Sequence, residues 1–145
     1  MYKDVVSYEL AKKLQEKGFV EQCVCYYDMR GELGYNIENP ISDRMLYSWN
    51  KDKTSWNGGN CDAPTISQAL RWLRDAKRLS IEPFYGTVRI GNHIVDDMIK
   101  PCWRCCVVPV DFYGFRCDKA AFDVEFESWE DAMTSGIEYA LDYLI

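Results

Sequence analysis

The sequence predicts an α+β fold, a two-layer domain in which three helices pack on one face of an antiparallel sheet of four to five strands. Two patterns predict this class. Three segments repeat apolar residues at helical spacing, whereas shorter segments alternate apolar with polar residues or run apolar between turns. A chain of 145 residues has the usual length of one domain. We therefore expect a single domain over residues 1–145, with a long polar loop at about 38–63.

The first predicted helix covers residues 7 to about 17. Ser7 is a favoured residue for the N-cap, and Val6, Leu10 and Leu14 recur at helical spacing. Gly18 follows, and glycine readily adopts the left-handed conformation that ends many helices. The segment is thus expected to bury one apolar face.

The second predicted helix lies in "APTISQALRWLRDAKR", residues 63–78. Thr65 and Gln68 match the T-x-x-Q capping box, in which each side chain bonds the other's backbone N–H. One face of this helix is apolar and consists of Ile66, Ala69, Leu70, Leu73 and Ala76. The capping box and the apolar face together predict a buried helix.

The third predicted helix is "SWEDAMTSGIEYALDYLI", residues 128–145. It opens at Ser128, and Glu130 and Asp131 stand in the first turn, where the helix dipole favours acids. Its wide apolar stripe contains Trp129, Ala132, Met133, Ile137, Ala140, Leu141 and Leu144. We expect this stripe to cover the sheet.

The strand pattern begins with a hairpin. "CVCYYD", residues 23–28, and "MRGELGY", residues 29–35, are expected to turn near Arg30 and Gly31. A third strand is expected within "SIEPFYGTVRI", residues 80–90, where Pro83 and Gly86 favour an edge position or a bulge.

A further strand is expected in "AFDVEFE", residues 121–127. Its apolar residues Phe122, Val124 and Phe126 alternate with Asp123, Glu125 and Glu127. Alternation of this kind predicts one face against the third helix and one face in water.

The segment "KPCWRCCVVPV", residues 100–110, holds three of the seven cysteines. Cys102 and Cys105 form a C-x-x-C pair, which occurs in zinc sites and redox centres. The flanking residues favour a buried strand instead, in which side chains alternate and the two thiols point to opposite faces. A metal site and a reactive thiol stay open as alternatives. An odd cysteine count in a chain of this size favours reduced thiols.

Two sets of residues are candidates for an interaction surface. Tyr47, Trp49 and Trp56 lie on or near the polar loop, where they either anchor a partner or, the reading we favour, fold back onto the core. Arg71, Arg74 and Arg78 follow one side of the second helix, a spacing found in nucleic-acid-binding helices. Asp75 interrupts that series, which favours a solvated face.

Composition and charge narrow the function classes. The net charge is −6, and residues 118–145 carry eight acids and one base, which disfavours a phosphate backbone as partner. No apolar run approaches the roughly 18 residues of a membrane span. The N-terminus lacks the layout of a signal peptide, so we expect a cytoplasmic protein. We find no catalytic constellation, because the one histidine, His93, adjoins the turn-like Gly91 and Asn92.

Four stretches, taken in order, resemble a family of small uncharacterised proteins from gut Bacteroidetes, their prophages and other mobile elements. They are "VSYELAKKLQEKGF", "YYDMRGEL", "APTISQALRWLRDAKRLSIEP" and "FESWEDAMTSGIEYALDYLI". The resemblance spans about two thirds of the chain and implies a mobile-element setting, with no activity, cofactor or catalytic residue. The chain departs from the family's pattern in its long loop at 43–60 and in "PCWRCC".

We therefore expect a non-enzymatic interaction or accessory protein of a phage or mobile element, without cofactor, whose partner is a host or phage protein. Two alternatives come from other classes. One is a nucleic-acid-associated protein that uses the basic side of residues 65–78, and the other is a thiol- or metal-dependent enzyme that uses Cys102 and Cys105. The sequence predicts neither an oligomeric state nor a particular partner.

Overall fold

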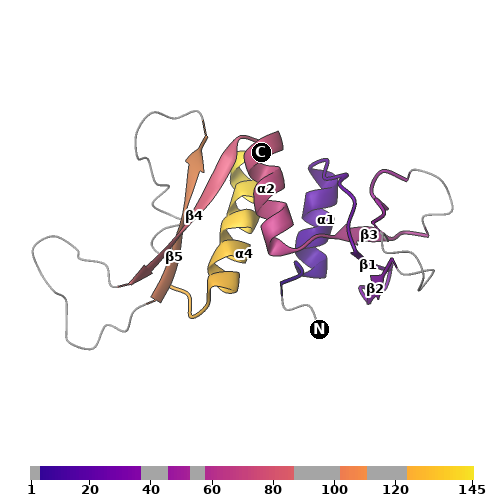
Figure 1. Cartoon of the computed structure of the whole chain (residues 1–145), viewed down its shortest axis with the longest axis horizontal. Helices are drawn as coiled ribbons and strands as arrows, with labels where there is room; N and C mark the ends of the chain where they lie inside the picture. The colour runs from indigo at the N-terminus through magenta and orange to yellow at the C-terminus, as the bar shows by residue number, and fades with distance from the viewer. Residues whose placement is uncertain (1–3, 37–45, 53–57, 87–101, 111–123) are drawn as a thin grey trace, which may run out of the picture. The chain divides into compact units, whose positions relative to one another are not determined.

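A computed structural model describes residues 4–36, 46–52, 58–86, 102–110 and 124–145 (Figure 1). The chain divides into two compact units, Met1–Trp72 with Ile145 and Leu73–Leu144. The predicted α+β class is confirmed, with three helices and five strands in the described ranges. The prediction of one sheet is wrong, because these strands form a three-stranded and a two-stranded antiparallel sheet.

Helix α1, Tyr8–Glu16, belongs to the first unit and confirms the first predicted helix. The Ser7 hydroxyl accepts a hydrogen bond from the Leu10 N–H at 3.2 Å and so caps the helix. Gly18 has the left-handed φ of 95° that ends it. Leu10 and Leu14 are buried, and α1 packs against strand β3, Cys61–Ala63.

The sheet of the first unit has the order β2-β1-β3. The predicted hairpin is confirmed, with β1 at Cys25–Tyr27 and β2 at Leu33–Tyr35. In its turn the Asp28 carboxylate accepts hydrogen bonds from the N–H groups of Arg30 and Glu32, at 2.8 and 3.0 Å. Strand β3 lies at the C-terminal end of the stretch predicted to be a polar loop.

Helix α2, Ile66–Ala76, confirms the second predicted helix and runs across the boundary between the units. Ile66, Ala69 and Leu73 are buried as expected. Two members of the predicted face are not, since Leu70 is only half-buried and Ala76 is exposed. Trp72 is buried as well, because its ring packs edge-on against Phe19 with centroids 5.5 Å apart. The buried stripe is therefore rotated toward Trp72.

The second unit contains strands β4, Leu79–Gly86, and β5, Cys102–Pro109, which pair antiparallel. The Val110 N–H donates to the Arg78 carbonyl at 2.8 Å, just beyond the paired register. Because backbone groups alternate between the two edges of a strand, Arg78 and every second residue after it face β5. Pro83 then turns its missing N–H to the other edge of β4, as the sequence predicted for an edge strand.

Helix α4, Trp129–Tyr139, begins at Ser128, whose hydroxyl accepts from the Asp131 N–H at 3.1 Å. It packs against β4 and β5 (Figure 1). Gly136 permits this close approach, since a Cβ there would lie 2.6 Å from Ile81 Cγ2 and 3.2 Å from Cys105 Sγ. The helix therefore covers the face of the β4–β5 sheet that carries Ile81 and Cys105.

The strand predicted over 121–127 is wrong where it can be assessed. Residues 121–123, and Phe122 with them, lie outside the described residues. Phe126 forms only an isolated bridge to Trp103, and Val124 is exposed, so the described part of this segment forms no regular strand. Glu125 and Glu127 were predicted to face water, and both are exposed.

The end of the third predicted helix also differs. After α4 the chain continues as a π-helix, η2, over Ala140–Leu144. Its i to i+5 hydrogen bonds change the angular spacing of side chains, so the stripe predicted from α-helical spacing breaks down here. Leu141 is buried, whereas Leu144 is 41% exposed. No helix in the described ranges is long and apolar enough to cross a membrane.

Candidate binding groove

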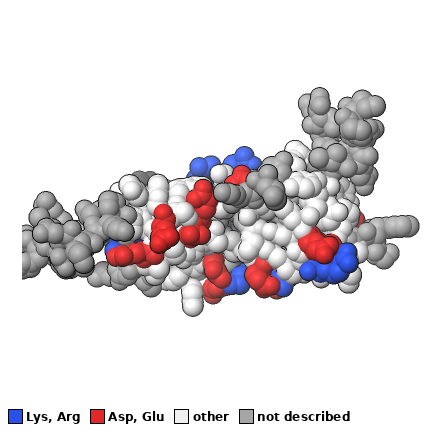
Figure 2. Space-filling view, turned by 90° about the horizontal axis from the view of Figure 1, so that it is seen from below, with Lys and Arg blue, Asp and Glu red and all other residues white. Residues whose placement is uncertain are grey.

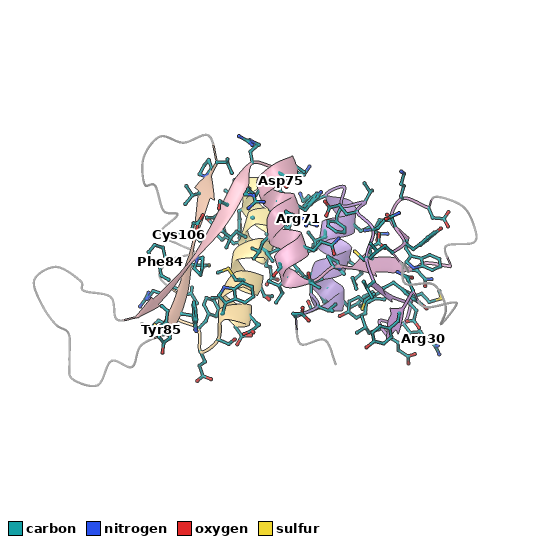
Figure 3. The ribbon with its side chains drawn as sticks, viewed as in Figure 1. Arg30, Arg71, Asp75, Phe84, Tyr85 and Cys106 are labelled. Atoms are coloured by element: carbon teal, nitrogen blue, oxygen red, sulfur yellow. The ribbon has the colours of Figure 1, made fainter. Side chains whose placement is uncertain are left out.

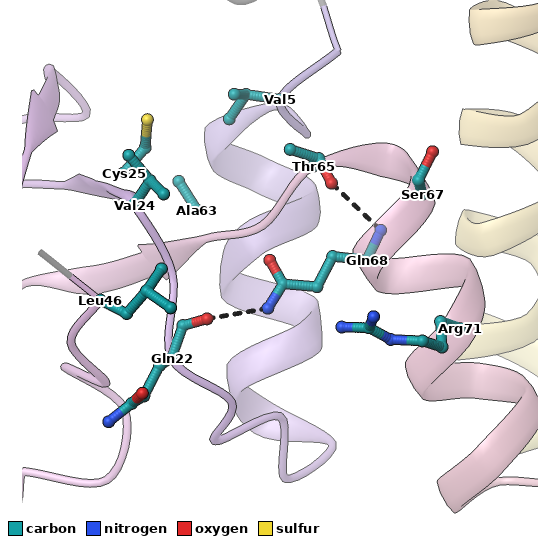
Figure 4. Close-up of a pocket in the computed structure, with 10 residues that line it drawn as sticks. All are labelled: Val5, Gln22, Val24, Cys25, Leu46, Ala63, Thr65, Ser67, Gln68 and Arg71. Atoms are coloured by element: carbon teal, nitrogen blue, oxygen red, sulfur yellow. Dashed lines mark hydrogen bonds between the residues drawn. The ribbon is translucent and has the colours of Figure 1, made fainter. Parts of the chain in front are cut away.

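A pocket of about 430 Å³, here called the groove, lies in the first unit beside the N-terminal end of α2 (Figure 4). Its apolar lining comes from Val5, Val24, Cys25, Leu46 and Ala63. Its polar lining comes from Gln22, Thr65, Ser67, Gln68 and Arg71. Apolar walls with a few polar groups are typical of a binding site.

The groove forms where the sheet of the first unit separates. Strands β1 and β3 pair as far as Cys25 and Ala63. Toward the N-terminus of β1, Cys23 pairs instead with Tyr47, through N–H to carbonyl hydrogen bonds of 2.9 and 3.2 Å. The chain after Ala63 leaves through Pro64 into α2. The backbone hydrogen bonds are thus satisfied on both sides of the opening, while Val24 and Leu46 stay exposed along it.

Gln68 spans this opening from α2 (Figure 4). Its side-chain amide donates to the Gln22 carbonyl at 2.9 Å, and its backbone N–H donates to Thr65 Oγ1 at 3.1 Å. Only half of the predicted capping box is formed, because the Gln68 amide bonds Gln22 and does not return to Thr65. The side chain that the pattern assigned to helix capping instead fixes one end of the groove.

The wall that carries Leu46 is held by a buried carboxylate. Asp62, on β3, is fully buried and accepts hydrogen bonds from the N–H groups of Trp49 and Asn50, at 2.8 and 3.0 Å, and from the Ser48 hydroxyl at 3.1 Å. The Asp62 N–H in turn donates to Asn50 Oδ1 at 3.0 Å. Burial raises the pKa of the Asp62 carboxyl, and its donors offset part of that rise. These bonds tie residues 48–50 to the sheet.

The aromatic residues of this segment pack together. The Trp49 ring lies 4.8 Å from Tyr47 and 5.3 Å from Tyr26, centroid to centroid. Its indole N–H donates to Asn36 Oδ1 at 2.7 Å, and the Asn36 amide donates to the Cys23 carbonyl at 2.8 Å. Trp49 is thus anchored on the sheet, as the favoured reading expected, whereas Tyr47 keeps an exposed side chain. Trp56, the third residue of that prediction, lies outside the described residues.

The predicted arginine series does not form one row on a helix. α2 ends at Ala76, and Arg78 follows it with a left-handed φ of 59°. Arg74 Nε lies 3.1 Å from the neighbouring Asp75 carboxylate. Of the three arginines, only Arg71 is among the residues that line the groove. Figure 3 shows its side chain on α2. The surface in Figure 2 shows basic and acidic side chains interspersed, without a continuous basic stripe among the described residues in view.

The cysteine segment is strand β5, as predicted. Cys105 faces α4, and Cys102, three positions away, falls on the opposite face. Cys106 is disulfide-bonded, so the expectation that all seven thiols are reduced is wrong for this residue. No group of three or more histidine, cysteine or acidic side chains in the described ranges is arranged to hold a metal ion.

The free buried thiols are poor nucleophiles. Burial raises the pKa of Cys25, of Cys105 and, to about 12, of Cys61, where the nearby Asp62 carboxylate adds to the rise. A thiol must lose its proton to attack, so these side chains hold almost no thiolate at neutral pH. They serve as small apolar residues in the two sheets.

Sequence reasoning found Arg71 but missed the rest of the groove. Val24 and Leu46 carry no signal, because single exposed apolar residues are common on surfaces. Asp62 does carry one: in "NCDAP" an acid stands between small apolar residues directly before a helix cap. A buried acid needs several donors, which would have pointed to the preceding polar segment as its partner.

The comparisons with known proteins add no relative. No protein-family model matches the sequence, and no curated protein and no solved structure matches the chain.

Proposed function

We propose that this chain is a non-enzymatic interaction protein whose groove binds an extended segment of a partner protein. The groove itself carries this proposal: its walls combine exposed apolar side chains with hydrogen-bonding groups, and the segments that form it are tied together by internal hydrogen bonds. Pre-formed sites of this kind lose little ordering free energy on binding.

A protein segment suits the groove better than a small molecule. The lining comes from four stretches of chain that are distant in sequence, and Val24 and Leu46 remain exposed along it. Exposed apolar side chains beside free hydrogen-bonding groups fit an extended peptide, whose alternate side chains enter and leave the surface. The resemblance noted above supports a host or phage protein as the source of that segment, and a mobile-element accessory role.

The two other candidate functions have less support. A nucleic-acid surface would need a basic patch, but Arg74 pairs with Asp75 and the whole chain carries −6. A thiol-dependent reaction at Cys102 and Cys105 would need a reactive thiolate, but burial raises the pKa of Cys105 and the two side chains lie on opposite faces of β5.

The proposal can be tested with displayed fragments of host and phage proteins, selected on the immobilised chain and measured by calorimetry as synthetic peptides. Leu46→Asp places a charge on the apolar wall, where the native side chain is 50% exposed, and should weaken binding at least tenfold. Met29→Asp is the matched control: Met29 is 72% exposed in the same unit and does not line the groove. Equal binding by both variants would refute the proposed function.

A further inference from the structure

Arg71 is a cation that lines the groove. Its side chain is exposed and forms no ion pair or hydrogen bond with the described residues. Figure 4 shows its guanidinium pointing from α2 toward Gln68 and Gln22. Arg74, one turn later on the same helix, pairs with Asp75 at 3.1 Å. The two arginines therefore differ in whether a partner within the chain already occupies them.

Among the described residues that line the groove, Arg71 is the one charged side chain, whereas the whole chain carries −6. An acid also lies nearby, since the Asp4 carboxylate helps to raise the pKa of Cys25. Charges are screened over about 8 Å at physiological salt, so a ligand group next to Arg71 is acted on mainly by that guanidinium. Charge complementarity thus favours a carboxylate beside Arg71.

The first turn of α2 is not available to bind that carboxylate. The Ile66 N–H donates to the Asp4 carbonyl at 2.6 Å, and the Gln68 N–H donates to Thr65 Oγ1 at 3.1 Å. A chain-terminal carboxylate is usually captured by several backbone N–H groups, and two of those in this turn are already bonded. A side-chain carboxylate needs only the planar fork of an arginine, which it binds through two parallel hydrogen bonds.

We propose that Arg71 selects the partner: the bound segment carries an Asp or Glu side chain that pairs with Arg71, next to an apolar residue that packs on Val24 and Leu46. This inference rests on the proposed function and adds the chemistry of the ligand. The apolar walls supply most of the affinity, and Arg71 determines which apolar segments are accepted, since charge pairs at a rim contribute mainly to specificity.

A displayed library of random peptides provides the test. It is selected in parallel on the native chain, on Arg71→Glu and on Arg74→Glu. We expect peptides from the native chain to share one acid at a fixed distance from an apolar residue, and Arg71→Glu to select a base at that position. Arg74→Glu is the matched control on the same helix and should select the same acidic peptides as the native chain.

Binding constants of one selected acidic peptide complete the test. The Arg71→Gln substitution should weaken the binding of this peptide about fivefold, as expected for an exposed ion pair. The difference in affinity between the native chain and the variant should become smaller at high salt. Selected peptides without the shared acid, or an unchanged preference in Arg71→Glu, would overturn the inference. If the peptides in either case still fail to bind the Leu46→Asp variant, the proposed function stands and only the inference about Arg71 is overturned. Peptides that bind Leu46→Asp normally, or no selected peptides at all, would overturn both.

Discussion

The two sheets of this protein are stabilised in different ways. The strands of the first unit are three residues each, and the backbone pairing of β3 is supplemented by the buried hydrogen bonds of Asp62. The strands of the second unit are eight residues each, and α4 covers them through apolar contact at Gly136. A polar network thus helps to stabilise one sheet, and an apolar interface with a helix stabilises the other.

The two kinds of stabilisation leave different amounts of apolar surface exposed beside each sheet. An apolar interface must exclude water, so the face of β4–β5 beneath α4 is closed. A directional network fixes the backbone of residues 48–50 without covering the adjoining side chains, and Leu46 stays exposed next to it. The groove therefore lies in the unit whose sheet is supplemented by this polar network.

The largest expected effect comes from the buried apolar residues of η2. Leu141→Ala removes buried methyl groups from η2 and should lower the free energy of unfolding by about 2–5 kcal/mol, because the side chain is almost fully buried. Chemical denaturation followed by circular dichroism measures it. Leu144→Ala is the control and should cost no more than about 0.5 kcal/mol, because that side chain is exposed. Equal losses would mean that the C-terminal turn is packed differently.

A smaller effect is expected from the polar network. Asp62→Asn replaces one of two acceptor oxygens by an amide and leaves a buried N–H of Trp49 or Asn50 without its partner. The expected cost is about 1–3 kcal/mol, although the loss of a buried charge offsets part of it. Asp75→Asn changes an exposed acid that pairs with its neighbour Arg74, and it should change stability by less than about 0.5 kcal/mol.

Thiol labelling shows where the chain opens in the Asp62→Asn variant. The Asp62 partners Ser48, Trp49 and Asn50 all lie in the first unit. Alkylation in native buffer, read by mass spectrometry, should therefore speed up more at Cys61 than at Cys105. A uniform rise at both thiols would show that the network stabilises the chain as a whole and not the first unit in particular.

The smallest expected effect is at the surface of the second unit. Arg104 Nη2 lies 2.7 Å from Glu125 Oε1, and the Arg104 side chain is only 13% exposed. Glu125→Gln keeps an acceptor but loses the charge, so we expect a cost of about 0.2–1 kcal/mol that decreases with salt. Glu127→Gln, at an exposed position two residues on, should be neutral in the same denaturation experiment. Salt-independent losses would argue against the ion pair.

Local sequence signals predicted the elements better than their arrangement. The Ser7 and Ser128 caps, the Gly31 turn and strand β5 appear where the sequence placed them, because caps, turns and periodicity act within a few residues. The single sheet did not follow, and neither did a regular strand in the described part of 121–127, because strand pairing depends on residues far apart in the chain. The groove was missed for the same reason, since its lining comes from four separate stretches.

By itself, the sequence determined the three helices, the hairpin, the edge position of β4 and the extended cysteine segment. The tertiary structure alone decided that the strands form two sheets, that Gln68 bonds Gln22 in place of completing its capping box, and that Asp62 is buried. It also decided which arginine of the predicted series lies at the groove. The physical reason is that local conformation depends on neighbouring residues, whereas the partner of a polar side chain depends on which distant backbone groups folding leaves within its reach.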